Sequence, residues 1–97
     1  MALRFEWDPD KARRNLHKHG VSFEEAATAF EDERSLTLPD PTHSVGEDRF
    51  VLLGRTSRGR VIVVAFTEPS KDIDAIRIIS ARLADCGERH DYEEGQA

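Results

Sequence analysis

RFVLLGRTSRGRVIVVAFT, residues 49–67, decides the fold of this chain. Two runs rich in β-branched and aromatic residues, 49–55 and 60–67, are separated by Thr56-Ser57-Arg58-Gly59. A connection of this length, with polar residues and a glycine, is typical of a hairpin loop. The stretch therefore predicts two antiparallel strands.

Further strands are expected on both sides of this hairpin. Alternation of apolar and polar residues predicts a short strand at 3–7, and it predicts an edge strand at 35–38 that ends at Pro39. The apolar run at 73–82 predicts the last strand.

Helix signals lie before and after the strands. Asp8 can cap a helix over 9–19, with Pro9 in its first position and Gly20 in the left-handed position that ends it. Ser22 and Glu25 have the spacing of a capping box before the next helix.

The succession of elements indicates the class of fold. A weaker acidic capping signal, Asp85 with Glu88, precedes an expected short helix at 86–94 that Gly95 closes. The order is then β-α-α-β-β-β-β-α. It predicts an α+β fold, a mostly antiparallel sheet with helices on one face, and a single domain over residues 1–97.

Charge is unevenly distributed along the chain. The sequence has 14 Lys and Arg against 19 Asp and Glu, a net charge of -5. Residues 1–20 and 51–82 are nevertheless net basic, whereas residues 21–50 and 83–97 are strongly acidic. A fold that brings the two basic segments together has a cationic face that can bind phosphate.

Several classes of protein are disfavoured. Cys86 is the only cysteine, so an internal disulfide and a cysteine-based zinc site are excluded. The four histidines have no recognised metal-ligand spacing, and we expect neither a metal nor a cofactor. No secretion signal and no membrane-spanning run is found, so we expect a cytoplasmic protein without membrane contact.

The first candidate site is the strand end Arg77-Ile-Ile-Ser-Ala-Arg82. A guanidinium group binds phosphate in bidentate geometry, although most strand arginines simply form salt bridges. Strand alternation puts Arg77 and Arg82 on opposite faces. Either a bulge near Ser80 or Ala81 redirects one arginine, or only one of them, for which we favour Arg82, lies in the site.

A second cluster lies in the first expected helix. Lys11, Asn15 and Lys18 share one face, and an adjacent stripe of Ala12, Leu16 and His19 is expected to face the core. His19 is a candidate general base or acid, or else a packed side chain that caps the helix end. The polar loop 40–49, which contains His43, Ser44 and Glu47, offers further acid-base groups.

The same residues resemble the BrnT toxins. The resemblance runs in order from Phe5 to Tyr92 and rests on FEWD (5–8), Lys11, Asn15, KHGV (18–21), FEEA (23–26), Phe30, Asp40, HS (43–44), GE (46–47), Arg49, IRIISAR (76–82), Glu88, Arg89 and Tyr92.

The resemblance implies a RelE-like fold, a twisted antiparallel sheet with an RNA-binding concave face. It also implies a bacterial type II toxin that is a metal-independent endoribonuclease and inhibits translation. The implied partner is a BrnA-type antitoxin with a ribbon-helix-helix part, so that the toxin meets DNA only through their complex.

Metal-free RNA cleavage requires a base, an acid and cations around the phosphorane. The candidates for base and acid are His19, Glu47 and Lys18, and Arg77 and Arg82 are expected to stabilise charge. We expect the remaining contacts to RNA from Arg49, Lys11, Arg55 and Arg60.

Two alternatives remain open. A non-catalytic module could bind nucleic acid or an acidic protein through the same cationic face. An autonomous DNA-binding regulator is disfavoured, because no reading helix is recognisable.

Overall fold

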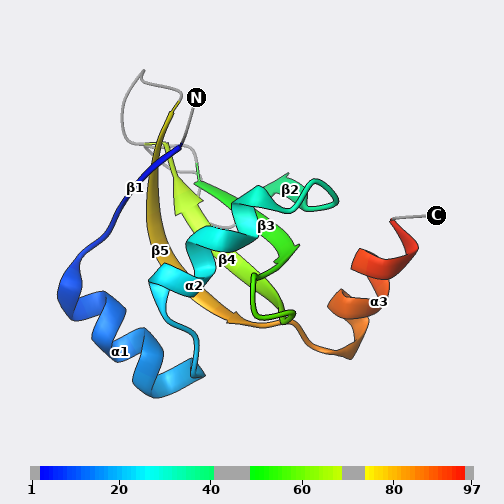
Figure 1. The fold of residues 1–97 in the computed structure, drawn as a ribbon, viewed down its shortest axis with the longest axis horizontal. Helices are drawn as coiled ribbons and strands as arrows, with labels where there is room; N and C mark the ends of the chain where they lie inside the picture. Colours follow the sequence, from blue (N-terminus) through cyan, green and yellow to red (C-terminus); the bar gives the residue numbers. More distant parts are fainter. Residues whose placement is uncertain (1–2, 41–48, 69–73, 96–97) are drawn as a thin grey trace.

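The computed structural model describes residues 3–40, 49–68 and 74–95. Its elements, drawn in Figure 1, are β1 (Arg4–Glu6), α1 (Pro9–His19), α2 (Phe23–Thr28), the 3-10 turn η1 (Ala29–Glu31), β2 (Leu36–Pro39), β3 (Arg49–Arg55), β4 (Val61–Thr67), β5 (Ala75–Leu83) and α3 (Cys86–Glu94). The helices and strands lie close to their predicted ranges, and η1 was not predicted.

All five strands belong to one mixed sheet in the order β1-β5-β4-β3-β2. Its three pairings among β2, β3, β4 and β5 are antiparallel, and β1 pairs parallel to β5. The predicted hairpin between β3 and β4 is confirmed. The Thr56 N–H donates to the Arg60 carbonyl at 2.8 Å, and Gly59 has the positive φ of 82° that this turn requires.

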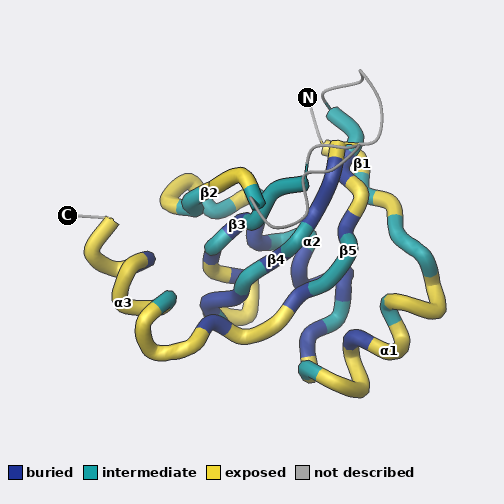
Figure 2. The backbone as a smooth tube through the Cα atoms, turned by 180° about the vertical axis from the view of Figure 1, so that it is seen from behind, coloured by how far each residue is buried: buried dark blue, intermediate teal, exposed yellow. Residues whose placement is uncertain are grey.

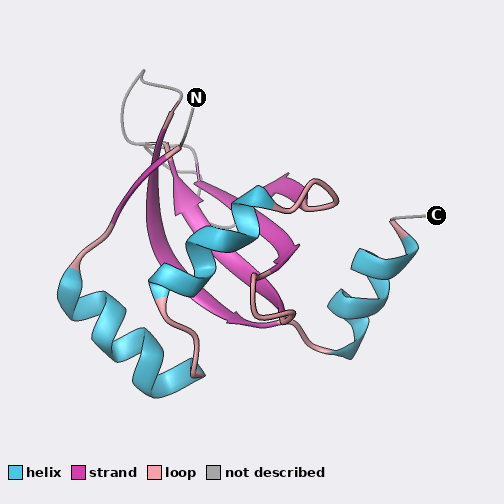
Figure 3. Cartoon of the chain, viewed as in Figure 1, coloured by secondary structure: helices cyan, strands magenta, loops and turns pink. Residues whose placement is uncertain are grey.

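One face of the sheet, which we call the inner face, holds the main core. Strand alternation directs Ile62, Val64 and Phe66 of β4 to this face, and all three are buried. Helix α2 and the turn η1 cover them with Phe23 and Phe30, and the Phe30 and Phe66 rings meet edge to face at 5.0 Å. Figure 3 shows α1 and α2 on the same side of the sheet.

Helix α3 packs on the opposite face, which we call the open face. Its Tyr92 is buried against Val61 and Ala84, with Leu53 and Val63 beside them. Val61 and Val63 alternate with the inner-face residues of β4, so α3 cannot share the layer of α1 and α2. The expectation that all helices lie on one face was therefore wrong for α3. Seen from behind in Figure 2, the sheet lies between α1 and α3.

The ends of α1 confirm the sequence prediction, but its buried face does not. The Asp8 side chain caps the helix, and Gly20 ends it at a φ of 72°. The expected core stripe was wrong in part, because Leu16 is 50% exposed whereas Asn15 is buried. Hydrogen bonds from Asn15 to the backbone of Val21 and Ala81, rather than the pattern of apolar residues, decide which side of α1 faces the sheet.

The predicted capping box of α2 is half formed. The Ser22 hydroxyl accepts a hydrogen bond from the Glu25 N–H at 3.0 Å, but the Glu25 carboxylate binds Arg60 and Thr56 instead of returning to the helix end. In α3 the Asp85 and Glu88 capping box is complete. Within the described ranges, no helix is long and apolar enough to cross a membrane.

Candidate functional site

A β-bulge interrupts the pairing of β4 with β5 beside the candidate arginines. Ser80 lies opposite Ala65, whereas the next pair joins Ile78 to Phe66, so Ile79 is an extra residue on β5. Such an insertion reverses the alternation of side chains across it. Of the two alternatives left open for the arginine spacing, the structure has the bulge, at Ile79 and therefore next to the expected position near Ser80 or Ala81.

The bulge puts both arginines of β5 on the open face. Arg77 lies opposite Thr67, and Arg82 lies opposite Val63. Thr67 and Val63 are four residues apart on β4, an even separation that keeps them on one face. Without the bulge, Arg77 and Arg82 would be directed to opposite faces.

Arg82 is held by Glu88 of α3. Its two terminal nitrogens each donate to one carboxylate oxygen at 2.7 Å, and its side chain remains 44% exposed. The hydrogen bonds raise the pKa of Arg82 and lower the pKa of Glu88, so both groups stay charged at neutral pH. The guanidinium is thus fixed in place with part of its surface accessible to an anion.

Arg49, Thr67 and Arg77 form a row across the open face. They occupy matched positions on β3, β4 and β5, and Arg77 approaches Glu6 of β1 at 4.0 Å. The Nε of Arg49 and the hydroxyl of Thr67 are buried and have no hydrogen-bond partner among the described residues. Because buried polar atoms normally have partners, the Arg49 Nε–H and the Thr67 hydroxyl are groups in this row that could still form hydrogen bonds.

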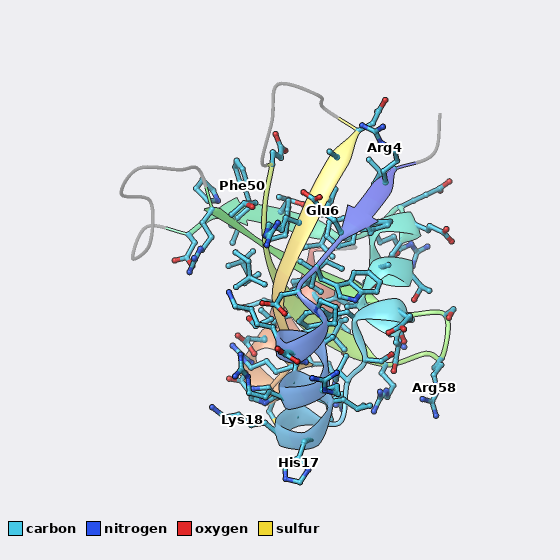
Figure 4. The ribbon with its side chains drawn as sticks, turned by 90° about the vertical axis from the view of Figure 1, so that its left-hand side faces the viewer. Arg4, Glu6, His17, Lys18, Phe50 and Arg58 are labelled. Carbon is cyan, nitrogen blue, oxygen red and sulfur yellow. The ribbon has the colours of Figure 1, made fainter. Side chains whose placement is uncertain are left out.

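Helix α1 brings four more basic side chains to the edge of β5. An open hollow of about 310 Å³ lies over the bulge residues Ile79 and Ser80, and its other lining residues are Lys11, Arg14, Asn15, Lys18 and His19. In Figure 4, Lys18 extends to the side of α1 away from α2, whereas His17 points away from the sheet. The structure thus brings Lys11, Lys18 and His19 beside the strand that carries Arg77 and Arg82.

Asn15 fixes α1 against this strand. Its side-chain amide donates to the carbonyl oxygens of Ala81 and Val21 at 2.8 and 2.9 Å, and its oxygen accepts from the Ala81 N–H at 3.1 Å. The basic face of α1 is therefore held beside the bulge.

Two predicted RNA contacts lie elsewhere. Arg60 is engaged by the buried carboxylate of Glu25 and by the Gly20 carbonyl oxygen. Arg55, at the hairpin end of the open face, donates to Gly59 at 3.0 Å and stacks over the Tyr92 ring at 5.7 Å. Neither lines the hollow over the bulge.

Glu47, together with His43 and Ser44, lies outside the described residues. Sequence reasoning missed Arg14 as a lining residue and Thr67 as part of the row on the open face. Arg14 had a usable signal, because it follows Lys11 by three positions on one helix face. Thr67 had none, since only the pairing of β3, β4 and β5 puts it between two arginines.

Arginines on one face of a sheet and a basic helix at its edge are features that nucleic-acid-binding proteins share. Among the described residues, no group of His, Cys, Asp or Glu side chains is arranged to hold a metal ion.

The chain belongs to the BrnT family, the ribonuclease toxins of type II toxin-antitoxin systems, whose family model matches residues 7–88. Membership of such a system implies an antitoxin partner.

Comparison with solved structures supports the same conclusion. The fold is similar to the crystal structure of the Brucella abortus ribonuclease toxin BrnT, with 28% sequence identity and a TM-score of 0.65. The match covers 87% of this chain and 99% of that one. No curated protein matches the sequence.

Proposed function

We propose that this toxin is a RelE-like, metal-independent endoribonuclease that cleaves RNA in the cytoplasm and thereby inhibits translation. Residues 1–97 act as one domain in this proposal. The observation that carries it is the bulge at Ile79, which directs Arg77 and Arg82 to one face of β5, the strand over which the basic side of α1 lies at Ile79 and Ser80.

Arg77 and Arg82 are proposed to stabilise the charge that develops on the scissile phosphate. Arginine suits this task because its charge is permanent and its donors match two phosphate oxygens. The bidentate bond to Glu88 orients the Arg82 guanidinium before RNA arrives, and it also makes Glu88 a competitor of phosphate for that group.

Acid-base catalysis is assigned to His19, Lys18 and Glu47. His19 is half-buried in the hollow over the bulge, where it can reach a 2′-hydroxyl or a leaving 5′ oxygen of bound RNA. The test specific to His19 is His19→Gln, which should abolish cleavage and leave the melting temperature unchanged. A large fall in melting temperature would instead indicate a packed, capping histidine.

The RNA chain is proposed to follow the cations on the two sides of β5. Lys11 and Arg14 contact it from α1, and Arg49 contacts it from the open face. Arg55 and Arg60, expected as further contacts, lie toward the hairpin and would meet only a longer RNA.

The antitoxin is proposed to be of the BrnA type, with a ribbon-helix-helix part that binds the promoter. Contact with DNA then occurs only in the toxin-antitoxin complex. A short reading frame for such a protein immediately downstream would support this assignment.

The decisive experiment compares Arg77→Ala and Arg82→Ala with wild type in an RNA cleavage assay containing EDTA, and in growth arrest on induction. We expect each substitution to lower cleavage by about 10²- to 10³-fold, the effect of removing one oriented donor. Arg58→Ala is the matched control, because Arg58 is 71% exposed at the far hairpin turn (Figure 4).

Two results would contradict the proposal. Folded Arg77→Ala and Arg82→Ala proteins that cleave at the wild-type rate would remove the assignment of these arginines. Tight RNA binding by the wild-type protein without cleavage products would favour a non-catalytic binding module.

A further inference from the structure

The open face also holds an apolar groove that the proposed RNA site does not use. The groove has a volume of about 270 Å³, and its floor is formed by Leu36, Leu38, Val51, Leu53 and Val63. Leu38 is 64% exposed. The other four floor residues are partly exposed, and apolar side chains that stay accessible together make this groove a candidate surface for contact with another protein.

The groove is continuous with the candidate active site. Strand pairing aligns Leu36, Leu53, Val63 and Arg82 in one row across the sheet. Glu88 belongs to both places, because it lines the groove and also holds the Arg82 guanidinium. An occupant of the groove would therefore lie against the arginine to which we assign charge stabilisation.

The chemistry of the groove disfavours RNA. Its two charged lining residues, Glu88 and Asp91, are carboxylates that repel phosphate. Its floor is entirely aliphatic, whereas proteins hold unpaired bases mainly on aromatic rings or arginine planes. The complementary ligand is a polypeptide segment with aliphatic side chains next to lysine or arginine.

We propose that this groove is the docking site of the antitoxin, which inserts a segment with aliphatic side chains and directs flanking basic side chains to Glu88 and Asp91. This inference rests on the proposed function, because it explains neutralisation as coverage of Arg82. It adds the place and the chemistry of the partner.

The test measures binding of the purified antitoxin encoded beside this chain to full-length toxin variants by calorimetry. Leu38→Glu and Asp91→Lys both change exposed positions, so the fold should tolerate them. Each should weaken antitoxin binding by about tenfold or more and leave RNA cleavage at the wild-type rate. Toxicity should then persist when the antitoxin is co-expressed.

Two matched controls use exposed positions outside the groove. Leu16→Glu changes another half-exposed leucine, and Glu94→Lys makes the same charge reversal on α3. Both should bind the antitoxin as wild type does. Melting temperatures identify any variant that fails to fold. Because Leu38→Glu and Asp91→Lys are chemically different, the test still holds if one of them does not fold.

Wild-type antitoxin affinity in both groove variants would overturn the inference. Loss of RNA cleavage in folded groove variants, with or without loss of antitoxin binding, would also overturn it, because the groove would then belong to the RNA. The binding titration does not depend on catalysis. Failure of wild-type protein to cleave RNA would therefore contradict the proposed function and not the docking site.

Discussion

The side chain of Asn15 pairs with the backbone of Ala81 as a neighbouring strand would. Its oxygen accepts from the Ala81 N–H at 3.1 Å, and its nitrogen donates to the Ala81 carbonyl at 2.8 Å. β1 pairs with β5 only from Ala75 to Arg77, so the edge of β5 has no strand partner beyond that point. Asn15 satisfies that edge just past the bulge and holds the basic helix against it.

Asn15→Ala should therefore destabilise the protein and loosen α1. The substitution leaves the buried amide and carbonyl of Ala81 without partners, which costs about 1–3 kcal/mol. Urea denaturation measures this loss, and hydrogen exchange should show faster exchange at Ala81.

Asn15→Asp distinguishes the hydrogen bond that Asn15 accepts from Ala81 from the one that it donates to Ala81. A carboxylate can still accept from Ala81 but cannot donate to its carbonyl or to that of Val21, so this variant should also be destabilised. Unchanged stability in both variants would contradict the role of Asn15 at the strand edge.

Glu25, which is buried, and Arg60, whose side chain is 31% exposed, form the ion pair that joins α2 to the hairpin. The Glu25 side chain is 5% exposed and also accepts from the Thr56 hydroxyl at 2.9 Å. Glu25→Ala should lower the free energy of unfolding by about 1–3 kcal/mol, because the partly exposed guanidinium of Arg60 and the buried Thr56 hydroxyl lose their charged acceptor. Glu24→Ala, at the exposed neighbouring position, should change it by less than about 0.5 kcal/mol.

The same pair makes stability depend on acid pH. Hydrogen bonding to Arg60 holds the pKa of Glu25 below its usual value of 4.5. The stabilisation is therefore fully present above that value and is lost as the pH falls through the lower folded-state pKa. Urea midpoints in this acid range should fall more steeply for wild type than for Glu25→Ala, and parallel curves would exclude Glu25 as the source.

The boundaries of the helices and the hairpin could be predicted because their signals are local. Pro9 and Gly20 mark the two ends of α1 by their own backbone preferences. The hairpin was predictable because Gly59 supplies the positive φ between two β-rich runs.

Features that depend on distant residues could not be predicted in the same way. The arginine spacing allowed either a bulge or a site with only one arginine, and the bulge at Ile79 depends on pairing with β4. The burial of Asn15 depends on the unpaired edge at Ala81, 66 residues away. Likewise, α3 lies on the open face because Tyr92 packs against Val61 there. The local signals for a helix at 86–94 carry no information about that contact.

Tyr92 anchors α3 through a hydrogen bond to Asp32. Burial and this bond raise the pKa of Tyr92, so its hydroxyl remains a donor. Burial opposes ionisation of Asp32, yet hydrogen bonds from Tyr92 and backbone N–H groups lower its pKa overall. Tyr92→Phe should cost about 1.5–3 kcal/mol, the range for a bond to a charged group. Hydrogen exchange in α3 should rise first, and unchanged protection there would contradict the anchor.

Glu88 is proposed to compete with RNA phosphate for the guanidinium of Arg82. Glu88→Gln removes the charge but keeps an oxygen that can still accept from the Asp85 N–H, so the α3 cap should survive. A partly exposed ion pair of this kind is worth about 0.2–1 kcal/mol, so RNA affinity in a binding titration should rise by about 1.4- to fivefold. The gain in RNA affinity should disappear in an Arg82→Ala background, because the guanidinium for which Glu88 and phosphate compete is then absent. An equal gain in both backgrounds would mean that Glu88 repels RNA only through its negative charge. It would contradict the proposal that Glu88 and phosphate compete for Arg82.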